Sequence, residues 1–258
     1  MGVAIVIPAR FASSRLPGKP LLRETGKYLI QHVYEQARKA RCASEVVVAT
    51  DDERILAAVK EVGGRAAMTG AGHASGTDRV AEVAANLRAE VIINVQGDEP
   101  QIDPEAIDRL AELMRDPSAD MATLAVPITC EEAYRSPSVV KVVCDDNGRA
   151  LYFSRSPIPM VRDGRPDFAA RPARFLQHLG VYAYRRDFLL RIAAAPPHPL
   201  EQSEKLEQLR VLGAGGTIGV GIVAHSHRGV DTPADYAAFV RWYRENGEDR
   251  AGGTRRVA

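Results

Sequence analysis

The chain has 258 residues, of which 45% are hydrophobic and 26% are charged, and its formal net charge is +1. This composition is that of an ordinary globular protein, and the near-neutral charge gives no general electrostatic basis for binding nucleic acid or a membrane surface. We therefore expect any anionic ligand to be held by a local cluster of basic residues.

The cysteines and the N-terminal segment indicate the compartment. Cys42, Cys130 and Cys144 are widely spaced and form neither a CxxC pair nor a zinc-binding pattern, so we expect free thiols in a reducing cytoplasm. The first residues contain a short apolar run without a preceding basic region, which predicts a buried strand rather than a signal peptide. No apolar run reaches the length of a transmembrane helix.

In the first half of the chain, short apolar runs alternate with helical patterns. Fully apolar runs are typical of buried parallel strands, and their alternation with helices predicts a mostly parallel α/β sheet with helices on both faces. Strands are predicted at 3–7, 45–49, 91–95 and 123–128, and helices at 28–41, 52–62, 76–87 and 104–115.

The middle of the chain departs from this alternation. Two strand-like segments, 139–144 and 149–154, flank an Asn147-Gly148 pair, and Asn-Gly is typical of a tight β-hairpin turn because it accepts positive φ. A further strand is predicted at 176–184. We therefore expect residues 131–185 to form an antiparallel insert or lid.

The last third returns to helices and a strand. A helix is predicted at 201–212, ended by Gly213 as a cap; Glu201 and Glu204 on it are expected to form a solvated acidic face. A strand at 219–224 and a capped helix starting at Thr232 follow. These elements predict a single domain over 1–246, with the insert at about 131–185 and a disordered polar tail at 247–258.

A cluster of basic residues follows the first predicted strand. Arg10, Arg15 and Lys19 lie on one loop, and ligands of open parallel sheets bind beyond the carboxyl ends of the strands. Arginine binds phosphate through two parallel hydrogen bonds and lysine acts as a point charge, so the loop predicts a polyphosphate site. It is not a Walker A loop, because Ser13 and Pro20 stand where that motif requires Gly and Ser or Thr. Three solvated loop cations are the alternative.

The strand at 91–95 ends in Gln96-Gly97-Asp98, which places a carboxylate at the same edge of the sheet. Gly97 permits close approach of the backbone, and Asp98 supplies an oxygen ligand of the kind that Mg²⁺ takes together with substrate phosphates. The alternative is a turn aspartate that hydrogen-bonds its own backbone.

Three further patterns do not predict a site. Residues 219–224 match GxGxxA, but they form a predicted strand and lack the strand–turn–helix context of a dinucleotide site, which disfavours a nicotinamide oxidoreductase. His225 and His227 are too few for zinc. Trp242 lies at helical spacing with Phe239 and Tyr243, which predicts packing rather than ligand binding.

An ordered series of motifs resembles the family of sugar-nucleotide cytidylyltransferases, and within it the enzymes that use 3-deoxy-manno-octulosonate (KDO) more than those that use sialic acid. The resemblance covers about residues 3–243. The motifs are IPAR at 7–10, LPGKPL at 16–21, VATD at 48–51, HASGTDR at 73–79, NVQGDEP at 94–100, ALYFSR at 150–155, QHLGVY at 177–182, PLE at 199–201, LEQLR at 206–210 and GVDTP at 229–233.

The resemblance implies a Rossmann-like nucleotidyltransferase fold and a transfer of CMP from CTP to KDO, giving CMP-KDO and pyrophosphate for lipopolysaccharide biosynthesis. It implies a site made of four groups of residues. The implied catalytic residues are Lys19, Arg10 and Asp98; the CTP-binding residues are Arg10, Ser13, Arg15, Lys19, Ser75, Gly76 and Arg79; the sugar-binding residues are Gln96, Arg155, His178, Tyr182 and Glu207; and the Mg²⁺ ligands are Asp98 and Asp231.

Alternatives remain open for several of these residues. His178 on its strand is also typical of a half-buried structural histidine, and Asp231 could instead serve the dipole of the helix that follows it. Gly70 and Gly72 stand where related sequences carry a basic and an acidic residue. No charged contact is expected there, and the loop is expected to be looser because glycine is permissive.

The sequence also predicts the assembly and leaves alternatives for the substrate. The edge strands of the predicted hairpin need to be covered, so we expect a homodimer with part of 131–185 at its interface. The alternatives to a KDO enzyme are a cytidylyltransferase for another ulosonate, such as sialic acid or 8-amino-KDO, and a non-catalytic sugar-nucleotide sensor on the same fold.

Overall fold

The chain forms a mixed α/β structure around a nine-stranded sheet in a computed structural model that describes residues 1–13, 15–73, 75–226 and 229–247. His227 and residues 248–258 of the predicted tail lie outside the described residues. The strands are β1 (Val3–Ala9), β2 (Glu45–Thr50), β3 (Ala66–Met68), β4 (Val91–Asn94), β5 (Met121–Pro127), β6 (Lys141–Cys144), β7 (Ala150–Ser154), β8 (Leu176–Arg185) and β9 (Ile218–Ile222).

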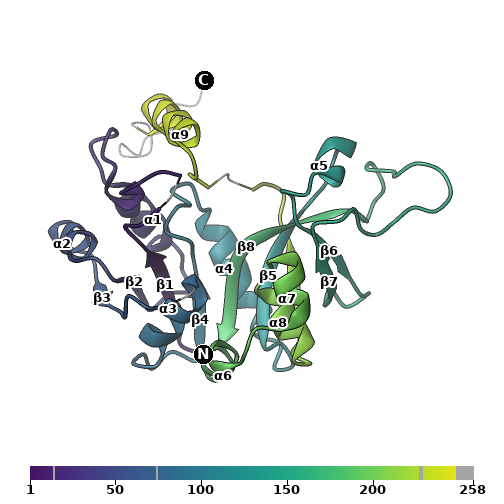
Figure 1. Cartoon of the computed structure of the whole chain (residues 1–258), viewed down its shortest axis with the longest axis horizontal. Coiled ribbons are helices and arrows are strands. Elements are labelled where there is room, and N and C mark those ends of the chain that lie inside the picture. The colour runs from purple at the N-terminus through teal and green to yellow at the C-terminus, as the bar shows by residue number, and fades with distance from the viewer. Residues whose placement is uncertain (14, 74, 227–228, 248–258) are drawn as a thin grey trace.

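Helices connect most of these strands (Figure 1). Within the described part of the chain, none of them is long and apolar enough to cross a membrane. They are η1 (Lys19–Leu21), α1 (Leu29–Ala37), α2 (Glu53–Glu61), α3 (Gly76–Ala84), α4 (Pro104–Leu113), α5 (Glu131–Arg135), α6 (Arg186–Ala194), α7 (Pro199–Glu204), α8 (Gln208–Gly213) and α9 (Pro233–Asn246).

The sheet has the order β3-β2-β1-β4-β8-β5-β9 along its main path. All strands on this path run in the same direction except β8, which is antiparallel to both β4 and β5. The prediction of a mostly parallel α/β sheet is therefore confirmed. Because β1 and β4 are parallel neighbours, the loops that follow them meet at the same edge of the sheet.

Alternation of apolar residues along the buried strands produces two helical layers. In β1, Val3, Ile5 and Ile7 pack toward α1, α2 and α4, whereas Ala4 and Val6 pack toward α3, α6 and α8. Successive side chains of a strand point to opposite faces, so a strand buried on both sides must be apolar throughout. These two cores fix the strand ends from which the loops of the site emerge.

The antiparallel segment is continuous with this sheet. Gly148 adopts φ 75° in the turn between β6 and β7, as the Asn-Gly pair predicts. β6 also pairs with the beginning of β8, while the rest of β8 lies between β4 and β5. The segment 131–185, predicted as an insert, thus ends in a strand of the central sheet, and Figure 1 shows the β6–β7 hairpin beside it on the side away from α2.

Several predictions of local structure were wrong or incomplete. The single helix predicted at 201–212 is two helices, α7 and α8, separated at Lys205, which adopts the left-handed φ of 56°. Positive φ at the end of α8 occurs at Gly215 rather than Gly213. The elements β3, α5 and α6 were not predicted; their short or amphipathic patterns carry weaker signals than the buried strands.

The helix break also overturns the predicted acidic face. Glu201 is buried and forms two hydrogen bonds with the guanidinium of Arg210, at 2.8 and 2.6 Å. Glu204 accepts hydrogen bonds from the hydroxyl of Ser154 and the amide of Arg155. Both carboxylates therefore hold the antiparallel segment and α8 in place instead of facing solvent.

Candidate active site

A cleft of about 320 Å³ lies where the loops after β1 and β4 meet. Close approach of the two loops requires a residue without a side chain, since a Cβ on Gly97 would lie 2.6 Å from the carbonyl oxygen of Pro8. The cleft is lined by Pro8, Ala9, Arg10, Ala12, Ser13, Arg15, Lys19, Pro20, Gly76, Gln96, Gly97, Asp98 and Asp231.

The loop after β1 is folded by its own contacts. Gly18 adopts the left-handed φ of 67°, and its amide donates a hydrogen bond to the carbonyl of Phe11. The Phe11 ring is covered by the guanidinium of Arg54, 3.4 Å from the ring centroid, and the Ser13 hydroxyl accepts a hydrogen bond from the amide of Leu16. This closed loop directs its three cations into the cleft.

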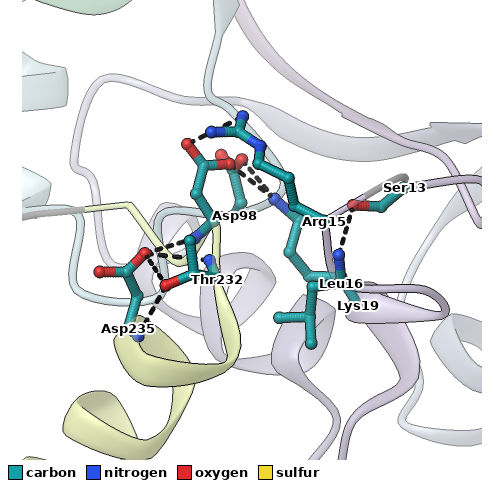
Figure 2. A network of polar contacts seen from close by, with 8 residues as sticks. Ser13, Arg15, Leu16, Lys19, Asp98, Thr232 and Asp235 are labelled. Carbon is teal, nitrogen blue, oxygen red and sulfur yellow. Dashed lines mark hydrogen bonds and ion pairs between the residues drawn. The ribbon is translucent and has the colours of Figure 1, made fainter. Parts of the chain in front are cut away.

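The three cations predicted from the sequence all line the cleft, together with both predicted metal ligands. Lys19 Nζ lies 2.7 Å from Asp98 Oδ2 and 3.3 Å from Asp231 Oδ1, and Arg15 Nη2 lies 3.3 Å from Asp231 Oδ2 (Figure 2). The Arg10 side chain has no hydrogen bond or ion pair with another described residue. Three cations against two carboxylates leave one positive charge, which suits an anionic ligand.

The carboxylates of Asp98 and Asp231 fit the requirements of a divalent cation. They converge from opposite ends of the sequence on one cationic group, the Lys19 ammonium, whose side chain is only 12% exposed. Mg²⁺ is typically held by one or two carboxylates plus substrate phosphate oxygens. The site therefore has the donor set for this ion, although the described residues contain no cluster of three or more acidic, histidine or cysteine side chains.

Asp231 lies just before α9, whose cap is Thr232, as the sequence predicted. Thr232 and Asp235 form the capping box of α9, and the Asp235 carboxylate also accepts the amide of Asp231. The amide of Val230 donates to the carbonyl of Asp98 at 2.8 Å, which ties the two segments together. The Asp231 carboxylate is thereby left to face Lys19 and Arg15.

The residues predicted for the nucleotide base lie at the start of α3. Ser75 caps this helix through a reciprocal capping box with Asp78, and Gly76 lines the cleft. The Arg79 side chain is fully buried; it forms an ion pair with Asp51 at 2.7 Å and contacts Thr69. Arg79 therefore holds the loop before α3 and does not face the cleft. It could affect a bound nucleotide only through the position of that loop.

The predicted looser loop before α3 is anchored at one of its two glycines. The amide of Gly70 donates to the Glu82 carboxylate at 3.0 Å, and Glu82 also contacts His73. The His73 contact lowers the pKa of Glu82. A Cβ would make ordinary contacts of 3.7 Å at Gly70 and would meet nothing within 4 Å at Gly72, so neither position requires glycine for steric reasons.

Of the five predicted sugar-binding residues, Gln96 lines the cleft, and Tyr182, His178 and Glu207 lie in neighbouring segments outside its lining. Gln96 donates to the side chain of Asn94, which is paired with Tyr182 across β4 and β8. The rings of Tyr182 and His178 lie 5.5 Å apart. Glu207 accepts a hydrogen bond of 2.7 Å from the hydroxyl of Thr77 on α3, a link between the two halves of the site that the sequence did not reveal.

A bulge in β8 brings His178 and Tyr182 together. The pairing with β5 shifts between Thr123 and Leu124, so that Thr123 pairs with Tyr182 and Leu124 pairs with Leu179. Residues four apart in a regular strand are separated by about 13 Å. The Thr123 hydroxyl lies in the bulge, 3.0 Å from His178 Nε2 and within hydrogen-bonding distance of two carbonyl oxygens of β8.

His178 is neutral in this environment. It is buried against the ring of Phe153, and burial lowers its pKa to about 3. The structure shows the features of the structural alternative, since the imidazole is packed, hydrogen-bonded and uncharged; the sugar-binding role of His178 stays a prediction.

Arg155 stands apart from the other four sugar-side residues. Its Nε donates to the carbonyl of Glu204 at 2.9 Å, and its Nη1 donates to the carbonyl of Pro137 at 3.0 Å. Among the described residues, no hydrogen bond joins it to Gln96, His178, Tyr182 or Glu207. It is thus the one cation of this group, positioned by main-chain carbonyls at the end of the hairpin.

Comparison with known proteins agrees with this geometry. The family described as Cytidylyltransferase matches residues 4–218. A protein of Geobacter sulfurreducens named 3-deoxy-manno-octulosonate cytidylyltransferase is 52% identical over 91% of this chain and 96% of its own length. A protein of Geotalea daltonii with the same name is 50% identical over 96% of this chain and its whole length.

Solved structures give a similar result. A CMP:2-keto-3-deoxy-manno-octonic acid synthetase in complex with CTP superposes with a TM-score of 0.89 and 48% identity, covering 95% of this chain and 99% of that one. A 4-diphosphocytidyl-2C-methyl-D-erythritol synthase of Anaerococcus prevotii superposes with a TM-score of 0.62 at 14% identity, a likeness of fold alone.

Proposed function

We propose that this chain, which belongs to the cytidylyltransferase family, transfers CMP from CTP to KDO and releases pyrophosphate. The observation that carries the proposal is the cleft in which Arg10, Arg15 and Lys19 face Asp98 and Asp231. The relatives named above support the choice of CTP and KDO. The product is an activated acidic sugar, which suits a cytoplasmic step of lipopolysaccharide biosynthesis.

The residues of the cleft account for the transfer without a covalent intermediate on the protein. The anomeric hydroxyl of KDO attacks the α-phosphorus of CTP in line; a new P–O bond forms while the bond to pyrophosphate breaks, and the hydroxyl proton is lost to solvent. Arg10, Arg15 and Lys19 neutralise the triphosphate, and positioning with charge neutralisation supplies most of the rate.

Asp98 and Asp231 would hold Mg²⁺, which when bound supplies a Lewis acid at the α-phosphate and lowers the pKa of the attacking hydroxyl. Lys19 lies against both carboxylates and also lines the cleft. Its ammonium has three donors, so it can keep a carboxylate partner while it binds a phosphate oxygen.

The acceptor sugar is assigned to the opposite side of the cleft. Arg155 supplies the cation for the KDO carboxylate, and Gln96, Tyr182 and Glu207 supply polar groups for its hydroxyls. His178 contributes a neutral hydrogen-bonding group because burial keeps it unprotonated. The contact of Glu207 with Thr77 places this group next to the start of α3, where the nucleotide is assigned.

The substrate assignment is tested by pyrophosphate release with Mg²⁺ present. Release with CTP and KDO should clearly exceed release with ATP or GTP, because the cytosine site and the sugar site both contribute to selection. A panel of KDO, 8-amino-KDO and sialic acid with CTP then identifies the acceptor. Equal turnover with ATP, or turnover with sialic acid and none with KDO, would contradict the proposal, and no turnover with any acceptor would favour the non-catalytic sensor.

The protein should also form a symmetric homodimer through the antiparallel segment. Within the described sheet β7 pairs only with β6; a single bridge joins Arg149, just before β7, to Gly219, and the rest of that edge has no strand partner. Leu151 on β7 is 62% exposed and Met160 in the following loop is 80% exposed, and we expect the dimer to cover these two apolar side chains. Sedimentation velocity across the micromolar range should show a dimer; Leu151→Glu should dissociate it, and a monomer in the unaltered protein would contradict the prediction.

A further inference from the structure

Lys141 is a buried charge without a carboxylate hydrogen-bond partner. Its side chain has no exposed surface, and its ammonium donates to the carbonyl oxygens of Ser136, Val139 and Arg155 at 2.9, 2.6 and 2.6 Å. All three of its protons are used. Burial lowers the pKa of Lys141, whereas the nearby Glu204 carboxylate raises it. Because burying a charge is costly unless it is fully satisfied, this arrangement needs a physical reason.

The three hydrogen bonds of Lys141 join the two backbone segments that hold Arg155. One bond is to the carbonyl of Arg155 itself, and the other two fix the turn at 136–139. That turn contains Pro137, whose carbonyl accepts a hydrogen bond from Arg155 Nη1. Lys141 therefore fixes both the main chain of Arg155 and the acceptor that orients its guanidinium.

Glu204 also holds Arg155 through two hydrogen bonds. Its carboxylate accepts the Arg155 amide at 3.0 Å and its carbonyl accepts Arg155 Nε at 2.9 Å. With Nε and Nη1 engaged, the Nη2 group of Arg155 has no hydrogen-bond partner among the described residues. The Nη2 group therefore remains available as a charged donor to a ligand carboxylate.

We propose that Lys141 is a positioning residue for the acceptor sugar, because it fixes the Arg155 guanidinium in the orientation that binds the sugar carboxylate. The inference rests on the proposed function through its assignment of Arg155. Lys141 does not touch the sugar; it acts through the turn at 136–139 and through the main chain of Arg155.

The test is steady-state kinetics of Lys141→Met, which keeps the length of the side chain and removes its charge and donors. The KM for KDO should rise by about tenfold or more, while kcat at saturating KDO and the KM for CTP stay within about twofold, as expected for loss of substrate binding alone. Loss of thermal stability without a change in the KM for KDO would overturn the proposal.

Arg185 provides a matched control. Like Lys141 it donates to three main-chain carbonyls, those of Met114, Asp116 and Ala119, but it lies at the opposite end of β8, paired with Val91. Arg185→Met should lower the melting temperature and leave the KM for KDO unchanged. If both variants raise that KM equally, the effect is general destabilisation and the proposal is wrong.

A double-mutant comparison shows whether Lys141 acts through Arg155. In an Arg155→Ala background, Lys141→Met should cause no further rise in the KM for KDO, because the group that it positions is absent. An equal rise in both backgrounds would contradict the inference. Wild-type protein without KDO-dependent pyrophosphate release would instead contradict the proposed function, so the two failures are distinguishable.

Hydrogen exchange of the unaltered protein covers the case in which Lys141→Met does not fold. Adding KDO with CTP should slow exchange of the amides of Ser136, Ser138, Val139 and Arg155, because a bound carboxylate stabilises the segments around the guanidinium. The amides near 114–119 serve as the internal reference. Unchanged exchange at 136–139 under saturating KDO would overturn the proposal.

Discussion

Replacing Lys19 with alanine should lower the rate of CMP transfer by roughly 30- to 900-fold, which corresponds to about 2–4 kcal/mol of lost transition-state stabilisation. The Lys19 side chain is only 12% exposed, and a poorly solvated charge acts more strongly on a developing negative charge. Pyrophosphate release at saturating CTP and KDO measures the effect. Arg15→Ala should cause a smaller loss, since that side chain is 65% exposed.

Substitutions of the residues assigned to the sugar should affect substrate binding rather than the rate of transfer. Arg155→Ala and His178→Ala should mainly raise the KM for KDO and nearly preserve CTP binding, which calorimetry measures directly. Melting curves come first, because Lys19→Ala leaves Asp98 without its hydrogen-bonded cation. A folded His178→Ala that loses CTP binding, together with a Lys19→Ala of normal rate, would show that the two subsites are reversed.

Asp98→Asn should reduce magnesium-supported activity on the order of 100-fold, because it keeps the shape of the side chain and removes the charge that a hard cation requires. Chelation should abolish the activity of the unaltered protein, and added Mg²⁺ should restore it. A magnesium titration of pyrophosphate release should show a weaker apparent affinity in the variant. Asp231→Asn should behave in the same way.

Asp108→Asn is the control for this pair. Asp108 accepts from Arg41 and from the amide of Cys42, away from the cleft residues, so its variant tests the general cost of losing a bonded carboxylate. It should affect melting and leave the magnesium dependence unchanged. Full activity of Asp98→Asn at low magnesium would remove Asp98 from the proposed metal site.

The site residues that the sequence alone predicted are those in the loops that follow buried strands. Arg10 and Asp98 follow apolar strands directly, and parallel neighbouring strands bring such loops to one edge. The cleft therefore follows from local pattern and a general rule of topology. Asp231 needed the family resemblance, since a position just before a capped helix equally suits the helix dipole; the cap that the sequence predicted at Thr232 is confirmed.

The part that the sequence did not predict depends on contacts between distant segments. Glu204 and Lys141 look like surface residues in a linear reading, because charged side chains are usually exposed. Lys141 is instead buried and Glu204 is half-buried, and both bond to residues that are distant in the sequence, Arg155 in the first case and Ser154 in the second. Likewise nothing local marks Arg79 as the partner of Asp51, 28 positions earlier in the chain.

The bulge in β8 has a consequence for how the acceptor preference of this protein could be re-engineered. The spacing between the backbone positions of His178 and Tyr182 is set by the bulge, so substituting either side chain changes the groups presented there and leaves that spacing unchanged. Changing the spacing requires insertion or deletion within the strand. Because side chains alternate with a period of two, removing residues 180 and 181 as a pair preserves the inward and outward faces of the remaining strand, whereas removing either one alone would turn its buried residues toward the opposite layer.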